Sequence, residues 1–166
     1  MTTSHKVFEL SGICIKGHVT IDNKYMEPDY RIEMGRQNLE ANEFANDIET
    51  NRYRERAKGL LPGSLDLDGN EIVIKDQVIV INYTYPFKIP CARIHGTCNH
   101  LGWTRAELCA TIQAGYHVIY DEELSVIDND PHSNGLYEIL NGYNLDDLSL
   151  CNVYKINNEY YLGVDS

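Results

Sequence analysis

Alternating and β-branched apolar positions predict strands along much of the chain. In the first third they cover residues 7–10, 13–21 and 30–34, and we expect Gly35 to end the third of these strands. Two nearly continuous apolar runs at 71–75 and 77–85 indicate strands of a core hairpin that is covered on both faces. A second hairpin is expected from strands over 148–156 and 160–164, joined by Asn157 and Asn158.

Apolar residues at helical spacing predict two helices. The first, over 39–58, begins with acidic residues, ends with basic ones and is followed by Gly59. The second, over 104–123, opens with a capping box from Thr104 to Glu107 and should cover the core strands. Its apolar stripe consists of Leu108, Ile112, Tyr116, Ile119 and Tyr120. We therefore predict one α+β domain over 1–166, with a mostly antiparallel sheet and two main helices at about 39–58 and 104–123.

Length and charge narrow the class of protein. The chain has 166 residues, which suits a single domain, and its formal net charge of -11 repels phosphate backbones and anionic lipids. We expect no membrane association and no non-specific binding to nucleic acid. No apolar run approaches the length of a membrane-spanning helix, and the start does not resemble a signal peptide, so a cytoplasmic location is expected. The five cysteines are scattered and odd in number, which predicts reduced thiols.

Four segments carry a resemblance to known sequences. Residues 102–108 and 115–123, followed by 135–139 and 144–150, resemble a pattern in small uncharacterised proteins of eukaryotic and large DNA virus genomes. The resemblance implies no particular function. A bias toward Asn, Ile, Tyr, Lys and Asp is typical of an AT-rich genome and fits a virus-encoded protein of the host cytoplasm or the virion.

Two His-x-Thr motifs are candidate catalytic elements. His18 and Thr20 form the first, and His95 and Thr97 form the second. The pair is similar to the motifs of two-histidine phosphoesterases, which implies that one imidazole acts as base, the other as acid, and the threonine hydroxyls hold phosphate without a metal. The second motif contains Gly96, and because glycine is a poor strand residue, this motif departs from the strand expected in that family. The alternative is that neither histidine is catalytic, with His18 an exposed strand residue and His95 a turn residue.

Four metal-ligating side chains are crowded before the second helix. Cys91, His95, Cys98 and His100 are donors that suit tetrahedral zinc. Their spacing packs all four into one short loop, whereas structural zinc sites usually pair two separated knuckles. The alternative to a zinc site is that the cysteines are buried free thiols near the start of the helix. We expect the protein to bind no cofactor.

A cluster of cations ends the first predicted helix. It consists of Arg52, Arg54, Arg56 and Lys58. These side chains could bind phosphate or an acidic partner, or they could complement the helix dipole and pair with acids on neighbouring turns.

The composition favours recognition of a protein. Tyrosine, with 12 copies, presents an apolar ring and a polar tip, and it is enriched at protein interfaces. We therefore favour a non-enzymatic accessory or protein-interaction domain with a protein partner or self-association. A metal-independent phosphoesterase acting on a nucleotide or cyclic phosphate is the alternative.

Overall fold

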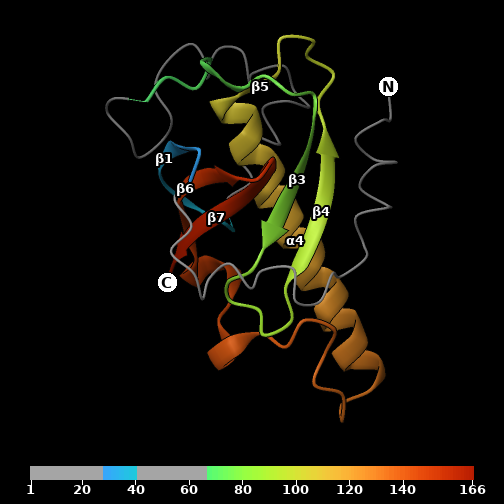
Figure 1. The fold of residues 1–166 in the computed structure, drawn as a ribbon. Helices are drawn as coiled ribbons and strands as arrows, with labels where there is room; N and C mark the ends of the chain where they lie inside the picture. The colour runs from blue at the N-terminus through green and yellow to red at the C-terminus, as the bar shows by residue number, and fades with distance from the viewer. Residues whose placement is uncertain (1–27, 41–66) are drawn as a thin grey trace, which may run out of the picture.

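A five-stranded sheet forms the centre of the molecule (Figure 1). The computed structural model describes residues 28–40 and 67–166. The strands of this sheet lie in the order β1-β6-β7-β3-β4, and every neighbouring pair is antiparallel except β3 and β7. The elements are β1 (Tyr30–Asn38), β2 (Ile72–Ile74), β3 (Val78–Tyr83), β4 (Cys91–Gly96), β5 (Trp103–Thr104), α4 (Arg105–Asn129), β6 (Ser149–Ile156) and β7 (Glu159–Asp165), with short 3-10 turns at Leu140–Gly142 and Leu145–Asp147. The predicted α+β class with a mostly antiparallel sheet is confirmed.

Helix α4 lies across one face of the sheet (Figure 1) and closes the core. Thr104 caps its start, accepting a hydrogen bond from the Glu107 backbone N–H at 3.0 Å. All five residues of the predicted apolar stripe are buried. Gly115 lets the helix approach β3 closely, because a Cβ at this position would overlap the Tyr83 hydroxyl. The prediction of this helix is confirmed, and the helix continues past Glu123 to Asn129.

The hairpin at the end of the sequence also forms as predicted. Strands β6 and β7 pair from Ser149 opposite Asp165 to Ile156 opposite Glu159. Asn157 and Asn158 connect them with φ values of 51° and 68°, in the left-handed region that asparagine tolerates better than most residues.

Strand β1 does not end at Gly35. The chain forms a bulge between Glu33 and Gln37, where Gly35 and Arg36 both have positive φ. Pairing with β6 then resumes and continues to Asn38. The prediction that glycine ends the strand was wrong, because a positive φ can kink a strand without stopping its ladder.

The prediction that the apolar runs at 71–75 and 77–85 pair as a hairpin is also wrong. Strand β2 pairs with β5, with Ile72 opposite Thr104 and Ile74 opposite Trp103. Strand β3 pairs instead with β4 and β7. Gly102, with φ 112°, permits the β2–β5 contact, because a Cβ there would overlap the Ile74 carbonyl.

Part of the predicted architecture lies outside the described residues. This applies to the strands at 7–10 and 13–21 and to all of the helix at 39–58 except Leu39 and Glu40, which follow β1 as a bend. Of the two predicted main helices, residues 28–40 and 67–166 contain only α4. No helix in these ranges has the length and apolarity needed to cross a membrane.

Candidate functional site

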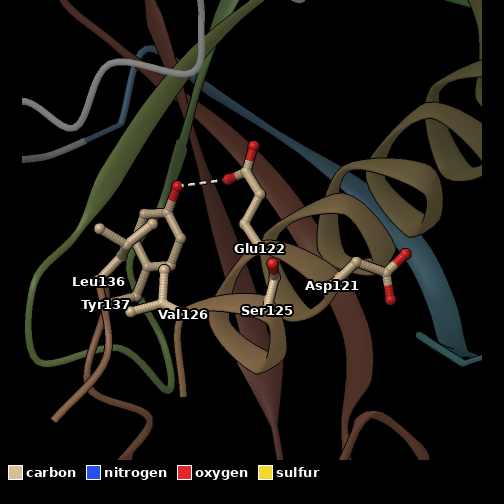
Figure 2. A pocket seen from close by; sticks show the side chains of 6 residues that line it. All are labelled: Asp121, Glu122, Ser125, Val126, Leu136 and Tyr137. Atoms are coloured by element: carbon tan, nitrogen blue, oxygen red, sulfur yellow. Dashed lines mark hydrogen bonds between the residues drawn. The ribbon is translucent and has the colours of Figure 1, made fainter. Parts of the chain in front are cut away.

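An open pocket of about 470 Å³ lies beside the C-terminal half of α4 (Figure 2). We call it the α4 pocket. It is lined by Asp121, Glu122, Ser125, Val126, Leu136 and Tyr137. The first four belong to the helix and the last two to the loop that follows it.

The helical residues share one flank of α4. Asp121 and Ser125 are four positions apart, as are Glu122 and Val126, and residues at this spacing are neighbours on a helix surface. Asp121 and Ser125 are exposed, and Leu136 on the loop is 49% exposed. The wall of the pocket therefore combines carboxylates with aliphatic surface.

The loop is fixed to α4 through its backbone. Glu123, only 1% exposed, accepts hydrogen bonds from the backbone N–H groups of Tyr137 at 2.9 Å and Glu138 at 3.0 Å. Gly135, with φ 92°, passes so close that a Cβ would overlap the Glu123 carboxylate. The Ile89 N–H donates to the Tyr137 carbonyl at 3.0 Å, which joins the loop to the turn between β3 and β4. The loop that carries Leu136 is thus held by hydrogen bonds to α4 and to the turn between β3 and β4.

A buried arginine from β4 supports the floor of the pocket. The Arg93 side chain is 1% exposed, and its Nη2 donates to Glu122 Oε1 at 2.6 Å and to Tyr137 Oη at 3.0 Å. The Tyr137 hydroxyl donates to the same Glu122 oxygen at 2.6 Å. Figure 2 shows Glu122 turned toward Tyr137, while Asp121 points away from the tyrosine.

The surroundings fix the charge state of these groups. Burial alone would lower the pKa of Arg93, but Cys91, Glu122 and Tyr137 hold it above the ordinary value. Burial raises the pKa of Tyr137, and its hydrogen bond to Glu122 raises it further, so the hydroxyl remains a donor. Burial likewise raises the pKa of the Cys91 thiol, although Arg93 acts in the opposite direction.

The pocket is consequently anionic. Arg93 compensates Glu122, but Asp121 forms no ion pair with any residue in 28–40 or 67–166. Within the same ranges, the second oxygen of Glu122 accepts no hydrogen bond.

The second His-x-Thr motif lies at the other end of β4, in the interior. His95 is 5% exposed, and its Nε2 is 2.8 Å from the Tyr83 hydroxyl. Burial lowers the pKa of His95 to about 3, with a further contribution from Arg93, so the imidazole is neutral at pH 7. Thr97, also buried, donates its hydroxyl to Glu107 at 2.7 Å.

The first His-x-Thr motif, formed by His18 and Thr20, lies outside the described residues. Their pairing with His95 and Thr97 stays a prediction. It requires that His18→Ala and His95→Ala each abolish cleavage of a cyclic nucleotide phosphate while the fold is retained.

The predicted zinc ligands are spread along β4 and the turn after it. Cys91 begins the strand, and His95 lies four residues further, about 13 Å away at the rise of a strand. Cys98 and His100 are exposed in the following turn. Among residues 28–40 and 67–166, no three His, Cys, Asp or Glu side chains gather as metal ligands.

Two further sequence predictions concern thiols and cations. Among the described residues, Cys91, Cys98, Cys109 and Cys151 form no disulfide with one another, and Cys14 is outside them, so the reduced state of the thiols stays a prediction. The basic cluster is also outside the described residues, so its role stays a prediction. Its members are Arg52, Arg54, Arg56 and Lys58.

The residues of the α4 pocket were not predicted from the sequence, although one signal was present. Arg93 alternates with Cys91 and His95 and so shares their face of β4, where a buried cation requires an acidic partner.

Comparisons of the chain with protein-family models, curated proteins and solved structures found no match.

Proposed function

We propose that this chain is an accessory protein-interaction domain that binds a partner protein of complementary positive charge at the α4 pocket. The observation that carries the proposal is the half-exposed Leu136 beside the carboxylates of Asp121 and Glu122. Protein interfaces commonly combine an apolar contact with polar groups around it.

The rigidity of the pocket supports this function. Glu123 fixes the loop backbone, and Arg93 with Tyr137 fixes Glu122. A surface that is already ordered loses less conformational entropy when it binds, so more of the contact energy contributes to affinity.

The negative charge of α4 also supports the proposed binding of a cationic partner. Asp121, Glu122 and Asp128 lie in the second half of α4, and the last turn contains no basic residue. Asp128 lies in that last turn, where negative charge opposes the helix dipole, whereas Asp121 and Glu122 lie about two turns earlier and are not subject to this effect. In a chain of net charge -11, the carboxylates of Asp121 and Glu122 at the pocket add to a field that attracts cationic surfaces and accelerates their association.

Two leucines provide a matched test. Leu136 lines the pocket and is 49% exposed, while Leu124 is 54% exposed on α4 but does not line it. We expect a protein captured from cell lysate by the wild type to be retained by Leu124→Ser and lost with Leu136→Ser. Equal capture by all three proteins would show that the pocket is not the docking surface.

A further inference from the structure

We infer that the α4 pocket receives a lysine or arginine side chain of the partner together with an adjacent aliphatic side chain. This inference rests on the proposed function and specifies the chemistry of the contacting segment. It follows from three properties of the pocket: its polar groups, its apolar wall and the support of Glu122.

The polar groups that face the pocket favour a cation. Its lining contains the carboxylates of Asp121 and Glu122 and the hydroxyl of Ser125, and it contains no lysine or arginine. The nearby guanidinium of Arg93 is 1% exposed and already bonded to Glu122. An ammonium or guanidinium group supplies the donors that these oxygens accept, whereas an anion would be repelled.

The apolar wall requires an aliphatic neighbour. Val126 from the helix and Leu136 from the loop line the same pocket, and about half of the Leu136 side chain remains in water. Contact with an aliphatic side chain would remove this surface from water, which is favourable in proportion to the apolar area covered. A lone cation would leave it exposed.

Glu122 is positioned before any ligand arrives. One of its oxygens is held by both Arg93 and Tyr137, which restricts the rotation of the carboxylate. Its other oxygen accepts no bond within residues 28–40 and 67–166, and Glu122 remains 37% exposed. The carboxylate therefore offers a fixed acceptor, and less side-chain freedom is lost on binding than for an unsupported glutamate.

Capped five-residue peptides can test the ligand chemistry on the full chain. One carries arginine flanked by leucines, a second carries lysine in its place, and a third carries citrulline, which keeps the shape of arginine without its charge. We expect the two cationic peptides to shift the backbone NMR signals of residues 121–126 and 135–138 saturably. Their affinity should exceed that of the citrulline peptide by about two- to five-fold, the range of an exposed ion pair.

Two aspartates of α4 provide a matched pair of variants. Asp121→Asn removes a charge from the pocket and should weaken binding of the arginine peptide by about two- to five-fold. Asp128→Asn removes the same charge from the exposed end of the helix and should leave binding unchanged, because Asp128 does not line the pocket. Equal losses in both variants would mean that only the general field of the protein attracts the peptide, which contradicts the inference.

The remaining outcomes separate the inference from the proposed function. Equal affinity for the citrulline peptide, signal shifts outside the pocket, or the same saturable shifts with calcium ions alone would each overturn the cationic side-chain ligand. In those cases, loss of the captured partner with Leu136→Ser would still support docking at the pocket. Retention of that partner by Leu136→Ser would instead remove the docking surface itself.

Discussion

The two ends of α4 differ in how well their charged residues suit the helix dipole. At the first end Thr104 caps the helix and Glu107 stands in the first turn, where the dipole favours an acid. The cation of the buried Arg105, which the dipole disfavours at this end, is compensated by its hydrogen bond to Glu71 at 2.8 Å. At the second end Asp128 lies in the last turn, where the dipole disfavours an acid, and no basic residue of that turn compensates it. The first end matches what a stable helix requires, and the second does not.

This difference indicates where function is to be sought. The helical residues that line the α4 pocket, which fall within 121–126, lie in the two turns just before this poorly compensated end. Proteins commonly sacrifice stability at binding sites, because the groups that attract a ligand repel one another or lack partners without it.

Replacing Glu123 should give the largest loss of stability. Glu123→Ala removes the acceptor of two backbone N–H groups, those of Tyr137 and Glu138, and we expect the free energy of unfolding to fall by about 3 kcal/mol. Urea denaturation measures the change. Glu123→Gln keeps one acceptor oxygen and should lose less. Equal stability of Glu123→Ala and the wild type would show that the loop does not depend on this carboxylate.

Acid should destabilise the protein through His95. Its pKa is about 3 in the folded protein and about 6.5 when unfolded, so below pH 6.5 the unfolded chain binds the proton and the folded one does not. The contribution of the neutral imidazole is therefore complete above pH 6.5. It is lost by about 1.4 kcal/mol per pH unit as the pH falls toward 3. Unfolding experiments at pH 6.5 and 5 should show a smaller pH effect in His95→Gln, and an identical effect would contradict the assignment.

Removing the cap should weaken the well-compensated end of the helix. Thr104→Ala leaves the Glu107 backbone N–H without its acceptor, and we expect a loss of about 1 kcal/mol in thermal or urea unfolding. Thr104→Ser retains a hydroxyl and should behave almost like the wild type. A loss of the same size in Thr104→Ser would assign the effect to packing of the methyl group rather than to the cap.

Reversing a charge at the other end should have the smallest effect and the opposite sign. Asp128→Lys places a cation in the last turn of α4, where it complements the dipole, and we expect a gain of about 0.5 kcal/mol. The gain should shrink in high salt, which screens exposed charges. Thermal unfolding at low and high salt measures both quantities, and a destabilised variant would show that Asp128 is not in conflict with the helix.

The local parts of the fold could be predicted from the sequence. Helix α4 follows from its capping box and apolar spacing, and the β6–β7 hairpin follows from two asparagines between apolar strands. The pairing of β2 with β5 could not be predicted in the same way. Apolar runs indicate that strands exist, but the choice of partner depended on the close approach of Gly102 to Ile74 in the folded chain.

The candidate site was harder to predict because its residues are far apart in sequence. Arg93, Glu122 and Tyr137 belong to a strand, a helix and a loop, and only folding brings their side chains within hydrogen-bond distance. The alternation of β4 places Arg93 on the inward face, but it does not identify the acid that compensates it. The short motifs that the sequence did display contributed His95 and Thr97, whose side chains are hydrogen-bonded in the interior.

The position of β7 in the sheet constrains how the chain folds during its synthesis. Although β7 is the last strand along the sequence, it lies at the centre of the sheet, between β6 and β3. Until β7 has been synthesised, β3 and β4 can form a hairpin, but among the described strands none joins them to β1 and β6. The sheet therefore closes only after translation has passed Asp165, and the nascent chain exposes an unpaired edge of β3 until then.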